Sequence, residues 1–231
     1  MRTTSTLLKS LAVLSALLPF CSSGLASIVY DNSTTDLNLL APASNGVAIG
    51  DEINLAGTDR LVNDFKFEYY LSGNAAGGET LQLTLYANDG LPAERTVNGV
   101  TRLAPSPGTV LYTSPVLNMQ AGFQTAEASA FQVLVPDTFT WAVTFQGLGA
   151  AEVAGLRVYD GPTVGTSFAD FWQQSGGTWN TYLLPNDSLG NPVAANFAAR
   201  VSAVPEPTTL ALALLAGLSW VGFLGYKRRS S

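Results

Sequence analysis

The chain has 231 residues, of which 12% are charged, and its 11 lysines and arginines against 17 aspartates and glutamates give a formal net charge of −6. It has no histidine, and Cys21 is its single cysteine. A Ser-His-Asp triad, a Cys-His dyad and an imidazole zinc site are therefore excluded within this chain, and so is an intrachain disulfide. The 22 glycines, the 12 prolines and a charged fraction well below the roughly 25% of ordinary soluble domains indicate a turn-rich globular protein.

Residues 1–26 have the order of a secretory signal peptide. Arg2 and Lys9 precede the apolar run 11–20, and small residues follow it as far as Ala26. A run of this length rises about 15 Å as a helix, half of a hydrocarbon core, so it can engage the export machinery without spanning a bilayer stably. We expect cleavage after Ala26. Cys21 leaves a lipoprotein anchor open as an alternative.

The segment 27–204 shows the period-two alternation of half-buried β-strands. Apolar side chains alternate with polar ones along 65–71, and 139–146 repeats the pattern. Turn residues such as Asn88-Asp89-Gly90 and Pro105-Ser106-Pro107-Gly108 separate the strands. We predict strands at 28–31, 65–71, 81–86, 109–113, 131–135, 139–146, 154–160, 168–173, 178–184 and 195–203.

These strands predict one all-β domain. Each strand has a single apolar face that a second sheet must cover, so we expect an antiparallel two-sheet β-sandwich with a jelly-roll-like arrangement. Six basic and sixteen acidic residues give the segment 27–204 a formal net charge of −10. Such a charge disfavours nucleic acid and anionic lipid as partners.

The segment 205–229 predicts a membrane anchor. Val204-Pro205-Glu206-Pro207 precedes the uncharged run Leu210–Tyr226, and Lys227, Arg228 and Arg229 follow it. Seventeen residues rise about 25 Å as a helix, enough for a thin bilayer, whereas a helix of the soluble core would carry a polar face. The basic cluster should stay cytoplasmic, which places the β domain on the other side of the inner membrane.

A Pro-Glu-Pro motif, an apolar span and a basic tail in this order resemble the PEP-CTERM sorting signal of exported bacterial proteins. The resemblance covers about residues 204–229. It implies recognition by an exosortase, a membrane protease of bacteria that make exopolysaccharide, with processing near Pro205–Pro207. The same motif is also catalogued under ice-binding protein C-termini. The stretch 50–58 and the strand after it are similar to the β-sandwich region of other PEP-CTERM proteins, which supports the fold and implies no activity.

Aromatic residues around a predicted turn are candidates for carbohydrate binding. Trp172, Trp179 and Tyr182 flank Gly176-Gly177 in a stretch that also carries amide side chains. If Phe171 faces the core, Trp172 faces outward, where a flat ring can stack on a sugar. These rings could instead fill the core, as Trp and Tyr commonly do in strands.

Calcium is the cofactor that the remaining side chains could bind, because oxygen ligands suffice for it. Asp31 and Asp36 lie in one oxygen-rich loop and Asp89 in another, but neither loop has the spacing of a known calcium signature. Asx-turns explain these residues equally well.

Carboxylates are the strong acid and base groups that the chain offers, so a glycan-active enzyme with paired acids is the alternative to a non-enzymatic role. The candidates are Glu68, Glu79, Glu94, Glu127 and Glu152. Nothing in the sequence pairs them, and solvated surface acids explain them. We therefore expect no enzyme, but an exported protein of the cell envelope or extracellular matrix, of structural or carbohydrate-binding type, with exopolysaccharide as a candidate partner.

Overall fold

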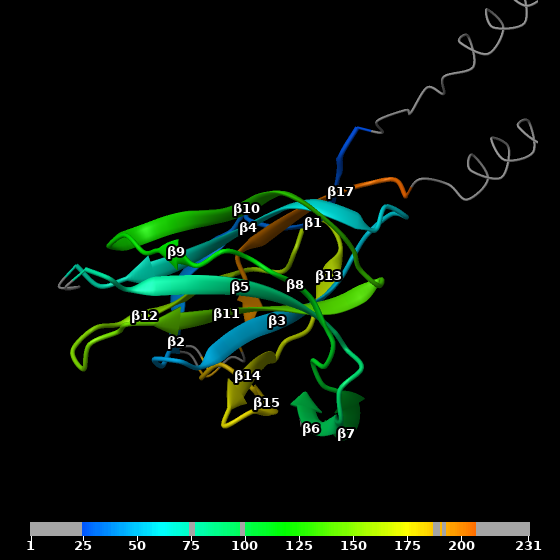
Figure 1. Cartoon of the computed structure of the whole chain (residues 1–231). Coiled ribbons are helices and arrows are strands. Elements are labelled where there is room, and N and C mark those ends of the chain that lie inside the picture. The colour runs from blue at the N-terminus through cyan, green and yellow to red at the C-terminus, as the bar shows by residue number, and fades with distance from the viewer. Residues whose placement is uncertain (1–24, 74–76, 98–99, 187–189, 191–192, 207–231) are drawn as a thin grey trace, which may run out of the picture.

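The computed structural model describes residues 25–73, 77–97, 100–186, 190 and 193–206. Within these residues the chain forms strands and turns and no helix, which confirms the all-β expectation. Two large antiparallel sheets pack face to face, and a two-stranded hairpin lies outside them (Figure 1). No helix in these ranges is long and apolar enough to cross a membrane. The expected signal peptide, apart from its last two residues, and the expected span Leu210–Tyr226 lie outside the described residues.

The first sheet, sheet A, has β4 at its centre. Strand β10 pairs with one edge of β4, while β17 and β12 share its other edge, β17 along the first half and β12 along the last residues. Strand β1 pairs with β17, and β2 and β16 pair with β12. The strands of sheet A are β1 (Ser27–Asn32), β2 (Asp36–Ala43), β4 (Leu61–Leu71), β10 (Gly122–Leu134), β12 (Ala154–Tyr159), β16 (Asn196–Phe197) and β17 (Ala199–Val204).

The second sheet, sheet B, runs in the order β15-β14-β3-β11-β5-β8, with β13 also paired to β3 and β9 to β5. Its strands are β3 (Ala48–Asn54), β5 (Thr80–Ala87), β8 (Val110–Thr113), β9 (Leu117–Asn118), β11 (Thr138–Gln146), β13 (Thr166–Ser167), β14 (Phe171–Ser175) and β15 (Thr178–Tyr182). The separate hairpin consists of β6 (Pro92–Val97) and β7 (Val100–Pro105).

The core lies between the two sheets and is formed by the apolar residues that alternate with polar ones along the strands. The apolar residues of β4 and β11 that share one face are buried there, and Trp141 contacts Phe65 and Phe67 with ring centroids 5.3 and 5.8 Å apart. Strands β3 and β11 come so close that a Cβ on Gly50 would lie 1.9 Å from the carbonyl oxygen of Trp141. Glycine is therefore required at position 50, where the two neighbouring strands lie closest.

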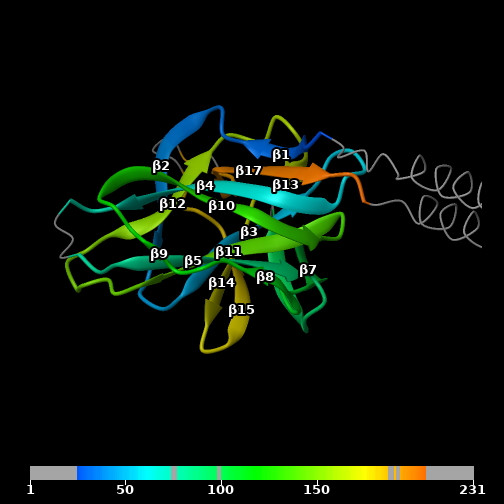
Figure 2. The ribbon, with the colours of Figure 1, turned by 45° about the horizontal axis from the view of Figure 1, so that its top comes forward.

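The hairpin β6–β7 continues the ribbon of β5 and β8 and folds over the outer face of sheet B. Hydrogen bonds between Ala87 and Gly108 and between Gly90 and Ser106 carry the pairing through the bend, where Asp89 also accepts bonds from Thr109. The stretches Asn88-Asp89-Gly90 and Pro105-Ser106-Pro107-Gly108, predicted as separate turns, do separate strands, but they pair with each other at this single bend. Figures 1 and 2 both place the hairpin beside β14 and β15.

The beginning and the end of the described domain lie at the same end of the molecule. Ser27 pairs with Ala203, so β1 starts where β17 finishes, as Figures 1 and 2 show. We call this the terminal end. Strand β4 runs from Leu61, paired with Val204 at the terminal end, to Leu71 at the opposite end.

Candidate functional site

The expected glycan platform is not formed as predicted. Phe171 and Trp172 do face opposite sides of β14, but Trp172 is fully buried and Trp179 is only 8% exposed. The physical reason is the hairpin β6–β7, which folds over this part of sheet B and packs Ala93 against the small apolar cluster that contains both tryptophans. Tyr182 is 44% exposed and contacts Phe171, with ring centroids 5.8 Å apart, so it is separated from the two indoles.

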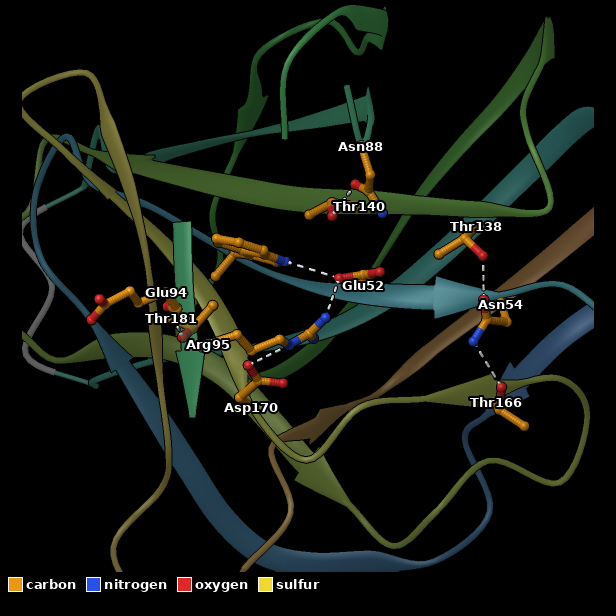
Figure 3. Close-up of polar contacts among 11 residues, drawn as sticks. Glu52, Asn54, Asn88, Glu94, Arg95, Thr138, Thr140, Thr166, Asp170 and Thr181 are labelled. Atoms are coloured by element: carbon orange, nitrogen blue, oxygen red, sulfur yellow. Dashed lines mark hydrogen bonds and ion pairs between the residues drawn. The ribbon is translucent and has the colours of Figure 1, made fainter. Parts of the chain in front are cut away.

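A buried ion cluster holds the hairpin on the sheet. Arg95 of β6 is 2% exposed and donates from Nε to Asp170 Oδ2 and from Nη1 to Glu52 Oε2, both at 2.6 Å (Figure 3). Its guanidinium lies 4.1 Å from the ring centroid of Phe168, and the indole nitrogen of Trp172 donates to Glu52 Oε2 at 3.3 Å. Burial lowers the pKa of Arg95, but its two carboxylate partners outweigh burial and raise it. Arg95 Nη2 and Asp170 Oδ1 are also buried but have no hydrogen-bond partner, so the two short ion pairs and the contact with Phe168 hold the cluster together.

Asp51 lies on the other face of β3, inside the main core. Its side chain is fully buried, and neither carboxylate oxygen has a hydrogen-bond partner. Burial raises the pKa of Asp51 well above its usual range. The backbone of Phe197 offsets part of this increase, and the nearby charge of Asp170 adds to it. Folding therefore favours the neutral form of this carboxyl group over the charged form.

The calcium candidates are occupied by protein contacts. Asp31 accepts bonds from the backbone and hydroxyl of Ser33, and Asp36 accepts from the backbone of Asn38 and pairs with Arg157. Asp89 accepts both of its bonds from Thr109, and these bonds lower the pKa of Asp89. The bonds of Asp31 and Asp36 are those of Asx-turns. Among the residues that the structure describes, no group of three or more acidic, cysteine or histidine side chains could hold a metal ion.

The candidate acids fall in different places. Glu94 is exposed on β6, and Glu152 accepts a bond from the backbone of Gly149 in a loop. Glu79 was expected at the surface, but this expectation is wrong. Glu79 is 2% exposed because its carboxylate folds back to accept a bond from the backbone of Gly77. Glu68 and Glu127 lie on neighbouring strands of sheet A and face the same side.

The outer face of sheet A is a polar surface built in register. Three pairs join β4 to β10 across this face: Lys66 with Glu127, Glu68 with Thr125, and Tyr70 with Phe123. Successive pairs are about 7 Å apart along the strands, because each step covers two residues. Arg200 of β17 pairs with Lys66 from the other side and extends the first row. We call the surface formed by these seven residues the polar face.

Charges on the polar face are mostly paired. Lys66 lies 3.2 Å from Glu127, Arg200 lies 4.0 Å from Asp31, and Glu68 accepts a bond of 2.7 Å from the hydroxyl of Tyr159. Burial and the bond to Glu68 raise the pKa of Tyr159 to about 12, so Tyr159 remains a hydrogen-bond donor at neutral pH.

Phe123 is an exposed aromatic ring on this face. It is 60% exposed, its centroid lies 4.8 Å from that of Tyr70, and the guanidinium of Arg157 lies 3.9 Å from its centroid. Arg157 is itself fixed by Asp36. Phe123 was not among the candidates predicted from the sequence, because the inward residues of this part of β10 are the small Ala126 and Ala128, which give a weak apolar alternation.

A hollow of about 230 Å³ begins at the row of Glu68 and Thr125, one row from the pair of Tyr70 and Phe123, where β17 leaves β4 and β12 takes its place. Polar side chains of four strands or turns reach it. Its lining comprises Ser33, Lys66, Phe67, Glu68, Thr125, Ala198, Ala199 and Arg200.

The sorting motif begins at the terminal end of the sandwich. Val204 is the last residue of β17, and Pro205 and Glu206 follow it as exposed residues. Pro207, Lys227, Arg228 and Arg229 lie outside the described residues.

Comparison of the chain with family models, with curated proteins and with solved structures finds no match.

Proposed function

We propose that the chain is an exported, membrane-tethered protein that acts at the cell surface by binding, not by catalysis. Its parts are a signal peptide over residues 1–26, a β-sandwich with jelly-roll-like connectivity over 27–204, and a PEP-CTERM anchor over 205–229. An exosortase processes the anchor and leaves the sandwich in the cell envelope or extracellular matrix. The binding requires no metal ion.

The main support for this proposal is that the domain begins and ends at the same end of the molecule, the terminal end. The pairing of Ser27 with Ala203 brings the expected cleavage point after Ala26 and the start of the anchor at Pro205 to one place on the surface. A sandwich held through Pro205 would present its opposite end and both sheet faces away from the membrane. This arrangement suits a surface protein whose ligand approaches from outside.

The polar face of sheet A supports a role in ligand binding. Its side chains come from the central strands of sheet A, and neighbouring ion pairs and hydrogen bonds fix several of them. Fixed polar groups lose little side-chain entropy when a ligand binds.

Two measurements test the export and the tether. Mass spectrometry of the mature protein should find Ser27 at the amino terminus and a carboxyl terminus near residue 205. Protease added outside intact cells should reach the β-sandwich, with permeabilised cells as the control. Retention of Arg229 in all mature chains would contradict exosortase processing, and protection of the sandwich in intact cells would contradict export.

A carboxylate-based glycan-active enzyme is the second candidate, because Glu68 and Glu127 share the polar face and Asp64 lies beside Lys66 and Glu127. Burial raises the pKa of Asp64, as expected for a general acid. This candidate predicts release of reducing sugar from a glycan, abolished by Glu68→Gln or Glu127→Gln. If the protein binds a polysaccharide and long incubation releases no reducing sugar from it, the first proposal is favoured.

A further inference from the structure

We propose that the polar face of sheet A binds a neutral polysaccharide, with the ring of Phe123 stacking on one sugar and the hollow that begins one row further along the strands taking another sugar of the same chain. This inference deepens the proposed function, because it names the ligand class and the site.

The ring of Phe123 has the position required for stacking. Tyr70 contacts it from β4, the guanidinium of Arg157 lies 3.9 Å from its centroid, and the side chain nevertheless remains 60% exposed. Because its neighbours already fix the ring, a sugar can stack on its free surface without further ordering of the protein.

Hydrogen-bonding groups lie at the right spacing from the ring. Glu68 and Thr125 occupy the next row, about 7 Å from the pair of Tyr70 and Phe123, and the row of Lys66 and Glu127 lies about 7 Å beyond that. An extended chain of sugars lying along β10 would meet the ring first and then successive hydroxyl, carboxylate and ammonium groups. Tyr159 orients the carboxylate of Glu68 by donating to it.

The balance of charge favours a neutral ligand. Lys66 and Arg200 each lie within 4.0 Å of a carboxylate, so the hollow offers hydrogen bonds to hydroxyl groups without a surplus of positive charge. The segment 27–204 carries a net charge of −10, which repels a polyanion. The hollow of about 230 Å³ is smaller than the 300–1,000 Å³ typical of pockets that enclose drug-sized molecules, so it suits one ring of a longer chain.

The proposed site is accessible because it lies at the end of β4 that is farthest from the proposed anchor. Tyr70 and Phe123 lie near Leu71, at the end opposite to Ser27 and Val204. The rival aromatic residues, Trp172 and Trp179, are closed off beneath the hairpin β6–β7. Among the described residues, Phe123 is thus a more exposed aromatic ring than either tryptophan or Tyr182.

The test is affinity electrophoresis of the full-length chain in mild detergent. The gels contain β-1,3-glucan, dextran, galactomannan or, as the anionic probe, alginate. We expect retardation by at least one neutral polysaccharide that survives 0.5 M salt, and we expect Phe123→Ala to weaken it about tenfold. Glu68→Gln should weaken it less, because an amide still accepts and donates hydrogen bonds.

Matched variants separate binding from folding. Phe123→Tyr keeps a flat ring and should retain binding, while Tyr182→Ala removes an exposed ring from the other sheet and should leave binding unchanged. Near-ultraviolet circular dichroism of each variant checks the core. The inference is overturned if no neutral polysaccharide retards the chain, if alginate alone does so, or if Phe123→Ala binds like the parent. Such a failure would leave the mass-spectrometric and protease tests of export untouched, so the two proposals fail separately.

Discussion

Replacing Arg95 by alanine should lower the free energy of unfolding more than any other single substitution in the hairpin β6–β7. Arg95 is 2% exposed, and its partners Glu52 and Asp170 are 7% and 1% exposed, so water screens little of this interaction. The alanine variant would leave two carboxylates buried without a cation, and removing one partner of a buried ion pair costs about 3–5 kcal/mol. We expect about 3 kcal/mol, because the hairpin can lift and hydrate part of the cluster.

Equilibrium unfolding of the full chain in urea, followed by tryptophan fluorescence, measures this loss. Trp172 and Trp179 lie beneath the hairpin, so acrylamide should also quench the alanine variant more strongly than the parent. Arg102→Ala, at an exposed position on the neighbouring strand, is the control and should stay within about 0.5 kcal/mol of the parent.

A triple variant decides whether unpaired charge is the cause. Combining Arg95→Ala with Glu52→Gln and Asp170→Asn leaves no charge buried alone, and it should recover much of the stability lost by the single change. Unpaired buried charge is not the cause if Arg95→Ala costs less than about 1 kcal/mol, or if the triple variant is no more stable than the single one.

The remaining predictions concern the two faces of β3. Asp51→Asn should gain stability over the parent as the pH rises above about 4, by up to about 1.4 kcal/mol per pH unit, because the pKa of Asp51 is higher in the folded than in the unfolded state. Urea midpoints at pH 4.5 and 8 measure this gain, and an equal difference at both values would contradict it. Gly50→Ala should lower the free energy of unfolding by more than about 3 kcal/mol or prevent folding, because its Cβ would meet the carbonyl of Trp141. Gly73→Ala is the control: nothing lies within 4 Å of its Cβ, so its free energy of unfolding should stay within about 0.5 kcal/mol of the parent's. Thermal melts of both glycine variants check this contrast.

The strands that could be predicted are those with a strong period of two. The alternation along 65–71 and 139–146 corresponds to β4 and β11, and the inward residues of both strands form the core. Strand β3 was not predicted, because Gly50, Asp51 and Glu52 interrupt its apolar pattern. The structure places all three in buried surroundings, where close backbone contact and an ion pair replace ordinary apolar packing.

The position of the tryptophans could be predicted only in part. Alternation assigned Trp172 correctly to the face opposite Phe171, but it could not show whether that face meets water. The covering hairpin is far away in the sequence, and Arg95 carries no pattern that points to Glu52 or Asp170. For the polar face, alternation identified Glu68 as outward, while the partners that fix it come from β10 and β12 and depend on register between distant strands.

The placement of β17 has a mechanical consequence. A load applied at Pro205 pulls along β17, which forms one ladder with β1 and another with β4. Extracting the strand would therefore require both ladders to slip together along their length, instead of opening one hydrogen bond at a time as a peeled edge does. A chain held in flowing water by its carboxyl end would thus carry the drag through one of its most firmly bonded strands.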